Sequence, residues 1–531
     1  MNIFSSLDQS IENIRKKMTV AQLAAFVSAL VFGIIAHGYV LFNRLSYHDN
    51  SNSLFSLGAT YEVNRWGLGI ISDLQRLSTK TYAVPVFNGV LSIIIIAVCA
   101  SLVAGMFKIK SRVAGAMIGA IMCVYPVVTS IFSFMFTSWP YFLALLLSIL
   151  AAYVYRDDKK YAVIYSAVFL ALSLSIYQAF LGVTATLLLL FLLVSALGGN
   201  IRDAKAYFLT GGKYLLGLGI GIGLWALSAK VFKTLKGVQS IEYKGWDEGY
   251  KISEFPDRLV EALREFFMFR VDEMNSLRYL RILTAAIFVI GIVLVLIRLV
   301  RANINGAVKV SSLVGITLLP IGMNIIYLLS TADKYIVDTM MLYADIFVYV
   351  LPIIIIDRTD SGAGDTTLIA KISSCLSGLV LICISVITIG YTYYDNGAYL
   401  KASMQQEAAV AYFTELVANI KGSENFSDDM PIVFVGMTNL ADGTIAEVAN
   451  NEELDGIVLE KYYDNLLDML RHGGSISFMR DHIGFGNEKV SEDDDDIIAM
   501  KEVQEMPVYP NAGCFKTIDG KLVVKMGEID D

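Results

Sequence analysis

Charged side chains are scarce in this chain of 531 residues. Asp, Glu, Lys and Arg together make up 17% of it, whereas hydrophobic residues make up 55%. A soluble protein of this length would carry about 25% charged residues. The surplus of apolar side chains therefore needs surroundings other than water, and a lipid bilayer is the usual choice. The composition predicts an integral membrane protein.

Residue patterns that hold metals are missing. The chain has five cysteines and four histidines, and no CxxC or Cys/His spacing typical of a zinc site occurs. Four of the cysteines lie inside apolar runs, and Cys514 stands alone near the C-terminus without a disulfide partner. The acidic run 491–496 (SEDDDD) lacks the spaced ligands and the glycine of a calcium loop. We expect no metal and no cofactor.

Patterns for binding nucleic acids and nucleotides are missing as well. The net charge is -8, and no basic stripe with interleaved aromatic residues is present. The chain also contains no nucleotide-binding glycine motif and no internal repeat. Nucleic acid is therefore excluded as a partner.

Long apolar stretches are abundant up to Tyr391. Each is long enough to cross the ~30 Å hydrocarbon core of a bilayer. The N-terminal stretch follows basic residues but is too long for the apolar core of a signal peptide. We predict about eleven transmembrane helices, at residues 20–42, 85–107, 113–133, 139–155, 161–177, 179–197, 212–232, 281–298, 310–329, 341–356 and 369–391.

Lysine and arginine collect in every second loop between these stretches. Short cytoplasmic loops attract such residues, whereas the short loops on the other side hold only Lys334. The pattern predicts a cytoplasmic N-terminus and an extracytoplasmic C-terminal region. One alternative stays open, because Ser175 to Gln178 separate two stretches with almost no loop. A single broken helix over 161–197 would invert the topology downstream.

Two long loops on the predicted outer side contain amphipathic segments. The second loop, 233–281, has a candidate helix from Pro256 to about Asp272. In the first loop, 43–82, one helical face carries the apolar residues Val63, Trp66, Ile70, Leu74 and Leu77. Both segments are typical of helices that lie on a membrane surface.

Beyond Tyr391 the composition becomes that of a soluble protein. The pattern predicts helices at 405–420 and 464–470, and strands at 431–436 and 522–526. A region of this size can form its own core. We therefore divide the chain into an all-α polytopic membrane domain, residues 1–397, and a small extracytoplasmic α/β domain, residues 398–531.

One carboxylate stands just beyond the first predicted span. Asp49 could remove a proton from a sugar hydroxyl as a general base, and Arg65 in the same loop could stabilise a phosphate leaving group. An alternative is that Asp49 caps a helix that begins near Ser53. His48 beside it can equally be a packing residue.

Other polar residues lie near the same predicted face. Tyr177 and Gln178, at the end of a span, could bind a sugar or contact a neighbouring helix. Arg270 and Arg281 could bind a lipid phosphate or anchor helix ends at the interface. Glu242, Asp247 and Glu248 form a second acidic group or a solvated loop.

These features together resemble the bacterial Gtr-type (type II) glucosyltransferases of the C-type glycosyltransferase superfamily. The matching segments extend over most of the chain: Tyr47-His48-Asp49-Asn50, Asn64-Arg65-Trp66, Ser175-Ile-Tyr-Gln-Ala179, Met506-Pro-Val-Tyr-Pro510 and Asp519-Gly-Lys-Leu-Val-Val524. The resemblance implies an inverting transfer of a hexose from a polyprenyl-phosphate-linked donor. The acceptor would be a cell-surface polysaccharide, such as O-antigen, at the outer face of the cytoplasmic membrane.

The same resemblance assigns roles to individual residues. Asp49 would be the catalytic base and Arg65 would hold the lipid phosphate. The substrate-binding set would be His48, Asn50, Arg65, Trp66, Tyr177, Gln178, Arg270 and Arg281. Family members commonly have paired acids and a Gly-Arg-Trp in the first loop, whereas this chain has Asn50 and Asn64 at those positions. A second acid would then come from Glu62, Asp73 or the second loop.

Two other classes of function are compatible with a membrane protein of this kind. A transporter or flippase of lipid-linked sugars tends to have broken helices and buried charges at the bilayer midplane, often in repeated halves. Here the middle of each predicted span is nearly free of ionisable groups, which favours an enzyme acting at one face. A non-catalytic glycan-binding protein would show no turnover at all.

Overall fold

The computed structural model describes residues 3–46, 48–51, 57–157, 160–241, 252–269, 271, 278–329, 337–358, 367–423, 426–436, 457–459, 475–485, 490–492 and 495–528. The chain forms two compact units. Unit 1 consists of Met1–Asn43 and Leu57–Asn396, and unit 2 of Arg44–Ser56 and Gly397–Asp531. Residues 44–56, predicted as part of the membrane domain, are thus grouped with unit 2.

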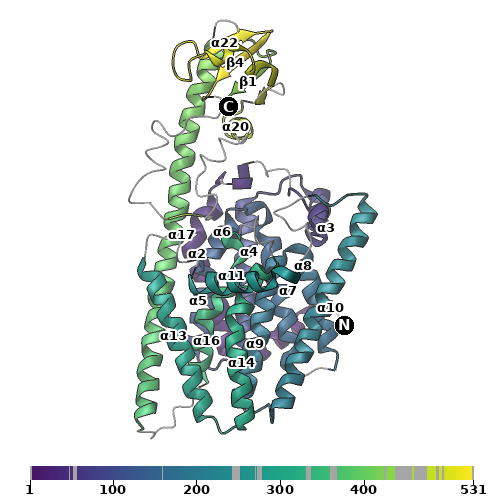
Figure 1. The fold of residues 1–531 in the computed structure, drawn as a ribbon, viewed down its shortest axis with the longest axis vertical. Coiled ribbons are helices and arrows are strands. Elements are labelled where there is room, and N and C mark those ends of the chain that lie inside the picture. Colours follow the sequence, from purple (N-terminus) through teal and green to yellow (C-terminus); the bar gives the residue numbers. More distant parts are fainter. Residues whose placement is uncertain are drawn as a thin grey trace. The chain divides into compact units, whose positions relative to one another are not determined.

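Unit 1 is built from helices (Figure 1). The helix α1 (Ile3–Lys17) precedes α2 (Val20–Phe42), whose Thr19 and Gln22 form a reciprocal capping box. The remaining α-helices that lie in unit 1 are α3 (Trp66–Ser78), α4 (Pro85–Met106), α5 (Arg112–Val124), α6 (Pro126–Phe132), α7 (Ser138–Tyr153), α8 (Ala162–Ile176), α9 (Leu181–Leu197), α10 (Ala204–Lys236), α11 (Phe255–Phe267), α13 (Arg278–Arg301), α14 (Gly306–Met323), α15 (Ile325–Leu329) and α16 (Phe347–Asp357). The long helix α17 (Leu368–Gly422) begins in unit 1 and ends in unit 2.

The helical nature of the predicted spans is confirmed, but their number is not. Each predicted apolar stretch coincides with helix, and seven of the described helices are long and apolar enough to cross a membrane. The bent pair α5 and α6, with a break of 41°, raises this number to eight if it is counted as one span. The other stretches fall on shorter or interrupted helices, such as α8 with 15 residues and α16 with 11. Eleven full-length spans are therefore not observed.

The chain reverses direction between α8 and α9. Ser173 of α8 donates a hydrogen bond to Ala144 O of α7, and further along α7 the hydroxyl of Ser148 donates to Phe180 O. Ser148 also bonds Thr184 of α9. The end of α8 and the start of α9 therefore both lie against the middle of α7. Tyr177, with φ -150° and ψ 111°, breaks the helix at this reversal.

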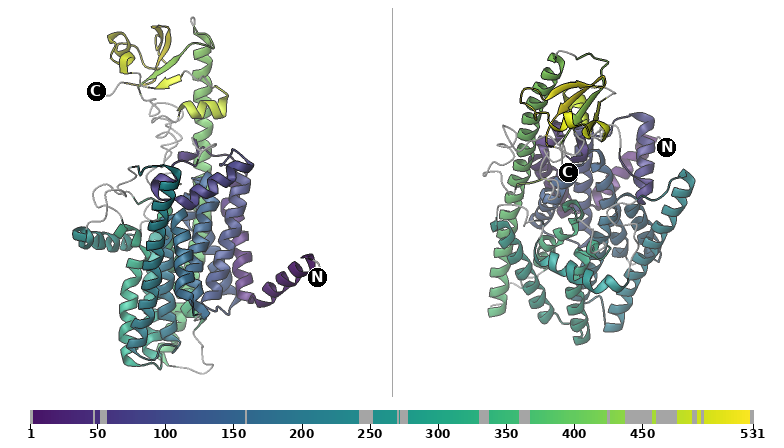
Figure 2. Two further views of the ribbon diagram at one scale, coloured as in Figure 1. Left: turned by 90° about the vertical axis from the view of Figure 1, so that its right-hand side faces the viewer. Right: turned by 45° about the horizontal axis from the view of Figure 1, so that its top comes forward.

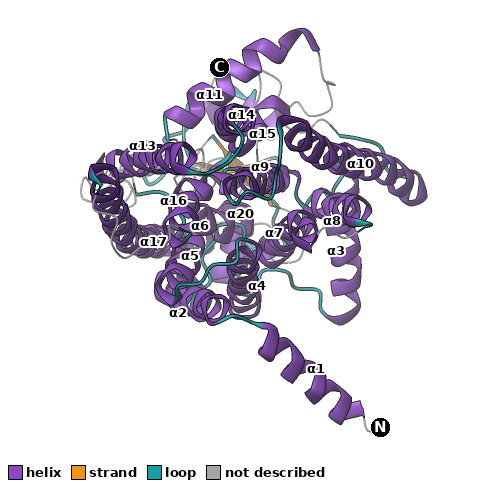
Figure 3. Cartoon of the chain, turned by 90° about the horizontal axis from the view of Figure 1, so that it is seen from below, coloured by secondary structure: helices purple, strands orange, loops and turns teal. Residues whose placement is uncertain are grey.

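The helix α9 lies at the centre of unit 1. Of the segment Gln178–Leu197, 78% is buried, compared with 17% of the window in α10. Viewed from below, α9 is surrounded by other helices, while α10 lies at the edge (Figure 3). The same view shows α3 and α11 side-on, across the direction of the surrounding helices.

The two predicted surface helices are present as α3 and α11. In α3 the side chains of Leu74 and Leu77 are 62% and 85% exposed, so this end of the predicted apolar face does not pack on the protein. Leu68 and Gly69 are the residues that α3 buries. Exposed leucines on a transverse helix are what a membrane-surface helix requires. The helix α11 ends at Phe267, earlier than predicted.

Small residues set the distance between α2 and α5. On α5, a Cβ added to Gly115 would lie 2.2 Å from Ala21 O, and one added to Gly119 would lie 2.1 Å from Ala25 O. Ala21 and Ala25 of α2 are fully buried or nearly so. Small residues four apart on facing helices allow such close backbone packing.

Unit 2 is an α/β unit with a four-stranded sheet in the order β2-β1-β4-β3. Its strands are β1 (Ile432–Val435), β2 (Val490–Glu492), β3 (Phe515–Ile518) and β4 (Lys521–Lys525). The central strand β1 runs parallel to β2 and β4, whereas β3 and β4 form an antiparallel hairpin. The hairpin turns at Asp519 and Gly520, which both have positive φ.

Alternate residues of β1 and β4 face two different cores. One face, with Ile432 and Phe434, packs on Phe413 and Leu416 near the end of α17. Figure 2 shows the sheet beside this end of the helix. The other face, with Val433, packs on residues near the short helices α21 (Asp495–Ile498) and α22 (Lys501–Gln504). The predicted strands at 431–436 and 522–526 correspond to β1 and β4, and the predicted helix 405–420 is the end of α17. The predicted helix 464–470 lies outside the described residues.

We expect Gly119→Leu to destabilise unit 1, because the new side chain would force α5 away from Ala25. The loss should be about 2–4 kcal/mol, as is usual for overpacking against backbone. The thermal unfolding midpoint in detergent measures it. Gly223→Leu is the control, because no heavy atom lies within 4 Å of a Cβ at Gly223 of α10. Equal midpoints for the two variants would contradict the packing argument.

Candidate functional site

A cavity of about 300 Å³ opens in unit 1 where α8 gives way to α9. This volume is within the range of about 300–1,000 Å³ typical of small-ligand sites. We call it the Arg65 cavity. Its lining consists of Glu62, Val63, Asn64, Arg65, Tyr177, Gln178, Ala179, Trp225, Ser240, Ile241, Ile326 and Met341. Three of the predicted substrate-binding residues, Arg65, Tyr177 and Gln178, therefore meet in one cavity.

A tight turn before α3 positions Arg65. The 3-10 turn Tyr61–Val63 ends at Asn64, which adopts the left-handed conformation with φ 63°. Asparagine tolerates this conformation better than most residues. Arg65 N then donates to Thr60 O at 2.8 Å, and Trp225 Nε1 of α10 donates to Asn64 O at 3.2 Å. The backbone of the turn is thus fixed both locally and by α10.

Two stacked tyrosines orient the guanidinium of Arg65. The ring of Tyr141 in α7 stacks on that of Tyr177, with centroids 4.2 Å apart and an interplanar angle of 13°. Arg65 Nη1 donates to Tyr141 Oη at 3.1 Å, and its Cζ lies 5.6 Å from the centroid of Tyr177. The positive charge is therefore held beside two aromatic rings, a favourable cation–π arrangement.

Gly67 allows the first turn of α3 to touch the end of α8. A Cβ at this position would lie 2.2 Å from Ser175 Oγ. A side chain at this position would require the Ser175 hydroxyl to turn away and Ile176 to shift. The glycine thus favours the close approach of α3 to α8 that brings Arg65 to Tyr177.

A second set of contacts ties α3 to the end of α10. Asp73 accepts a hydrogen bond from Lys236 Nζ at 2.7 Å and another from Tyr61 Oη at 2.8 Å. The bond from Lys236 lowers the pKa of Asp73, and burial raises the pKa of Tyr61. Trp66 stacks on Phe232 of α10, with centroids 4.6 Å apart. Asp73 and Trp66 therefore hold the helix and do not line the cavity.

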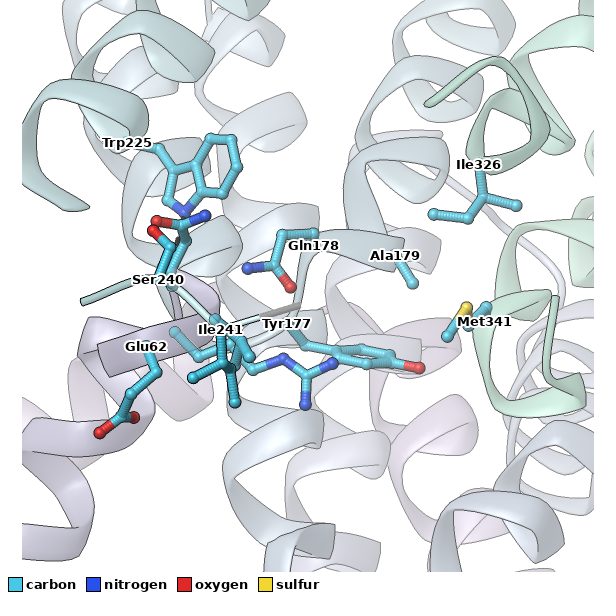
Figure 4. A pocket seen from close by; sticks show the side chains of 12 residues that line it. Glu62, Tyr177, Gln178, Ala179, Trp225, Ser240, Ile241, Ile326 and Met341 are labelled. Atoms are coloured by element: carbon cyan, nitrogen blue, oxygen red, sulfur yellow. Dashed lines mark hydrogen bonds between the residues drawn. The ribbon is translucent and has the colours of Figure 1, made fainter. Parts of the chain in front are cut away.

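The polar groups of the Arg65 cavity suit a ligand that has both negative charge and hydroxyl groups. Gln178 lies between Trp225 and Met341 in Figure 4 and offers both a donor and an acceptor. Tryptophan and tyrosine rings supply apolar faces, and the arginine supplies positive charge. The carboxylate of Glu62 accepts from Thr60 N at 3.1 Å and points away from the other labelled side chains (Figure 4).

The remaining predicted residues lie elsewhere. Arg281, in the first turn of α13, is half-buried beside Met268 and does not line the cavity. Arg270 and the acidic residues of the second loop, Glu242, Asp247 and Glu248, lie outside the described residues.

Asp49 belongs to unit 2. It is exposed and lies in the 3-10 turn His48–Ser51. The alternative role, as the cap of a helix that begins near Ser53, concerns residues outside the described ones. Asn50 beside it is 6% exposed and donates to Leu45 O at 3.5 Å. The backbone of His48 is described, but its side chain is not.

A glutamine of α17 binds the segment that carries Asp49. Gln406 accepts a hydrogen bond from Ser46 N at 2.7 Å and donates one to Arg44 O at 3.0 Å. Arg44 also pairs with Asp481, at 3.6 Å between nitrogen and oxygen. The residues just before Asp49 are therefore fastened at both backbone and side chain.

A half-buried histidine completes this attachment. His482 Nε2 lies 2.5 Å from Ser46 Oγ, and its ring stacks on Phe478 at 4.4 Å. Burial, together with nearby Arg44, lowers the pKa of His482 to about 4. The imidazole is thus neutral in the folded unit at neutral pH.

Sequence reasoning missed most of the cavity lining. Trp225 and Met341 are separated from Arg65 by several helices, and only folding brings them together. The one available signal was Trp225, an aromatic residue with a polar N–H inside an otherwise apolar stretch. No group of three or more His, Cys, Asp or Glu residues that could hold a metal occurs among the described residues. Independence from metals stays a prediction.

Unit 1 and its cavity define a helical membrane protein with a polar site at one end of its central helix. A family model described as Glucosyl transferase GtrII matches residues 38–356, which include every residue lining the Arg65 cavity. The chain belongs to this family, which identifies it as a glycosyltransferase. No curated protein and no solved structure matched the chain.

Acid should loosen the attachment of the Asp49 segment. The unfolded histidine takes up a proton near its ordinary pKa of 6.5, whereas the folded one does so near 4. Between these values the unfolded state binds more protons, so stability falls as the pH is lowered. We expect hydrogen exchange of residues 44–46 and 475–485, corrected for intrinsic rates, to be roughly threefold to tenfold less protected at about pH 5 than at about pH 7.5.

The His482→Gln variant is the matched control for this measurement. Glutamine can still bond Ser46 but does not titrate, so the difference between the two pH values should shrink. An equally large difference in the variant would assign the effect to other groups.

Proposed function

We propose that this glycosyltransferase transfers a glucosyl group from a polyprenyl-phosphate-linked donor to a cell-surface polysaccharide at the outer face of the cytoplasmic membrane. The observation that carries the proposal is the meeting of Arg65, Tyr177 and Gln178 in one cavity of about 300 Å³. An arginine beside aromatic rings and an amide is suited to a sugar phosphate. The match to the Glucosyl transferase GtrII family favours glucose as the transferred sugar.

The proposed reaction is a single displacement at the anomeric carbon. The carboxylate of Asp49 removes the proton from an acceptor hydroxyl, and that oxygen forms the new bond to the anomeric carbon. The bond between this carbon and the phosphate oxygen breaks, and polyprenyl phosphate leaves with the electron pair. Arg65 stabilises the negative charge on the leaving phosphate.

The proposed topology places the Arg65 cavity on the extracytoplasmic side. We infer about eleven crossings, with α8, α5 with α6, α14 with α15, and α16 serving as short or bent spans. Basic residues at the far end of α9, including Arg202 and Lys205, agree with a cytoplasmic location of that end. A C-terminal unit outside the membrane follows, with the acceptor polysaccharide on the same side.

Substitution of Asp49 or Arg65 should abolish most transfer. We expect Asp49→Asn to lower the rate by about 10²–10⁴-fold, because the general base is lost. Arg65→Gln should lower it by about 10²–10³-fold, because one charged donor to the leaving group is lost. Release of labelled polyprenyl phosphate from a polyprenyl-phosphate glucose donor measures both effects.

Two exposed residues provide matched controls. Arg76→Gln changes an arginine of the same helix that does not line the cavity, and Asp428→Asn changes an exposed acid of unit 2. Both variants should retain activity. Full activity of Asp49→Asn in a correctly inserted protein would remove Asp49 from the mechanism, and full activity of Arg65→Gln would do the same for the proposed phosphate site.

Labelling of introduced cysteines tests the orientation. In a Cys375→Ser background, which removes the one exposed native thiol among the described residues, we expect a membrane-impermeant maleimide to label Lys80→Cys in intact cells. Lys205→Cys should react only after the cells are opened. Both positions are exposed, so access of the reagent depends on the side of the membrane. The reverse pattern would place the Arg65 cavity in the cytoplasm.

A further inference from the structure

A second cavity lies at the opposite end of α9 from the Arg65 cavity. Its volume is about 220 Å³, and the residues at the α9 end are Val194, Leu197 and Gly198. The lining also includes four cations, Lys108, Lys110, Arg298 and Arg358. We call it the Arg358 cavity. All of its residues belong to unit 1.

The two arginines are held in place by backbone carbonyls. Arg358 donates through Nε and Nη2 to Phe107 O, at 3.2 and 2.8 Å, and Arg298 Nη2 donates to Arg358 O at 3.1 Å. Both side chains are half-buried. A guanidinium has more N–H groups than these bonds use, so each arginine retains donors for a ligand.

Among the described residues that line this cavity, none carries a carboxylate. The nearby Asp357 accepts hydrogen bonds from the backbone nitrogens of Lys110 and Ser111, both at 2.8 Å, at the start of α5. Its oxygens therefore satisfy a helix N-terminus. Four cations around one concave space repel one another, and an anion inside the space would relieve that repulsion.

The backbone at Lys108 is in a conformation that favours glycine. The φ angle of Lys108 is 51°, in the left-handed region. This turn ends α4, and Ile109 N donates a hydrogen bond back to Ala104 O at 3.0 Å. Glycine would adopt this conformation without strain. A lysine at such a position indicates that its side chain has a use there.

The preference of Lys and Arg for the cytoplasmic side explains basic residues at helix ends, but it does not explain why these four surround a cavity. Arg202, in the loop that follows α9, and Lys205, in the first turn of α10, are exposed and do not line the Arg358 cavity. Such residues suffice to set the topology. The four cations come from three separate parts of the chain and share one concave space, which is a feature of a binding site.

We propose that the Arg358 cavity binds a phosphate group. Arginine forks match the geometry of phosphate oxygens, and lysines add charge. The phosphate belongs either to the headgroup of an anionic phospholipid or to a soluble phosphate compound. This site lies at the other end of α9 from the proposed reaction and does not depend on it.

Native mass spectrometry of the full-length protein, with phosphatidylglycerol as the probe and phosphatidylcholine as the neutral comparison, tests the proposal. We expect Arg298→Gln/Arg358→Gln to weaken retention of phosphatidylglycerol by roughly tenfold or more. Arg202→Gln/Lys205→Gln, which removes the same charge from the same end of unit 1, should retain it. Equal retention by both double variants, or equal loss in both, would overturn the proposal.

A third variant tests the proposal even if the arginine double variant does not fold. Lys108→Gly removes one cation and relieves the strained φ, so the protein should stay folded while its binding weakens. Unchanged binding in this folded variant would also count against the site.

Inorganic pyrophosphate distinguishes the two sources of phosphate. For a soluble phosphate compound, pyrophosphate should bind the lipid-free protein and displace phosphatidylglycerol, and the cavity variants should lose both effects. For a lipid headgroup, pyrophosphate should have no effect while retention of phosphatidylglycerol depends on the cavity residues. If the cavity variants still bind both phosphatidylglycerol and pyrophosphate, both sources are excluded.

Discussion

The reversal of the chain at Tyr177 and Gln178 is the constraint on which the cavity depends. Tyr177 has an extended backbone at the point where the chain turns from α8 into α9. Its ring stacks on that of Tyr141. That pair of rings fixes the guanidinium of Arg65. Gly67 permits the approach of α3 to α8 that brings the arginine there. A displaced reversal would separate all of these groups.

The helix α9 carries polar chemistry at both of its ends and almost none between them. Its interior is packed among apolar side chains, so charged groups can be accommodated only where the bundle meets water or lipid headgroups. At one end an arginine, an amide and aromatic rings form the Arg65 cavity, and at the other end four cations form the Arg358 cavity. One buried helix thus supports two sites of different chemistry.

Unit 2 contributes more than a separate fold, because it includes the segment that bears Asp49. Gln406 binds the backbone of that segment as a neighbouring strand would, and His482 and Asp481 bind its side chains. These bonds explain why residues 44–56 group with the C-terminal residues although they lie far away in the sequence. The C-terminal unit therefore affects the position of the proposed catalytic base.

The sequence alone determined where the helices are, because an apolar stretch in a bilayer must satisfy its backbone hydrogen bonds internally. It also indicated β1 and β4, and it singled out Arg65 in the first long loop and Tyr177 and Gln178 at the end of a span. The number of spans stays a prediction, because hydropathy does not detect the breaks within α5–α6 and α14–α15 or the shortness of α16. Only the tertiary structure joined Arg65 to Trp225 and Met341, separated Trp66 from the cavity and placed Asp49 in unit 2. The physical reason is that these relations depend on packing between residues distant in sequence, and no local pattern records such packing.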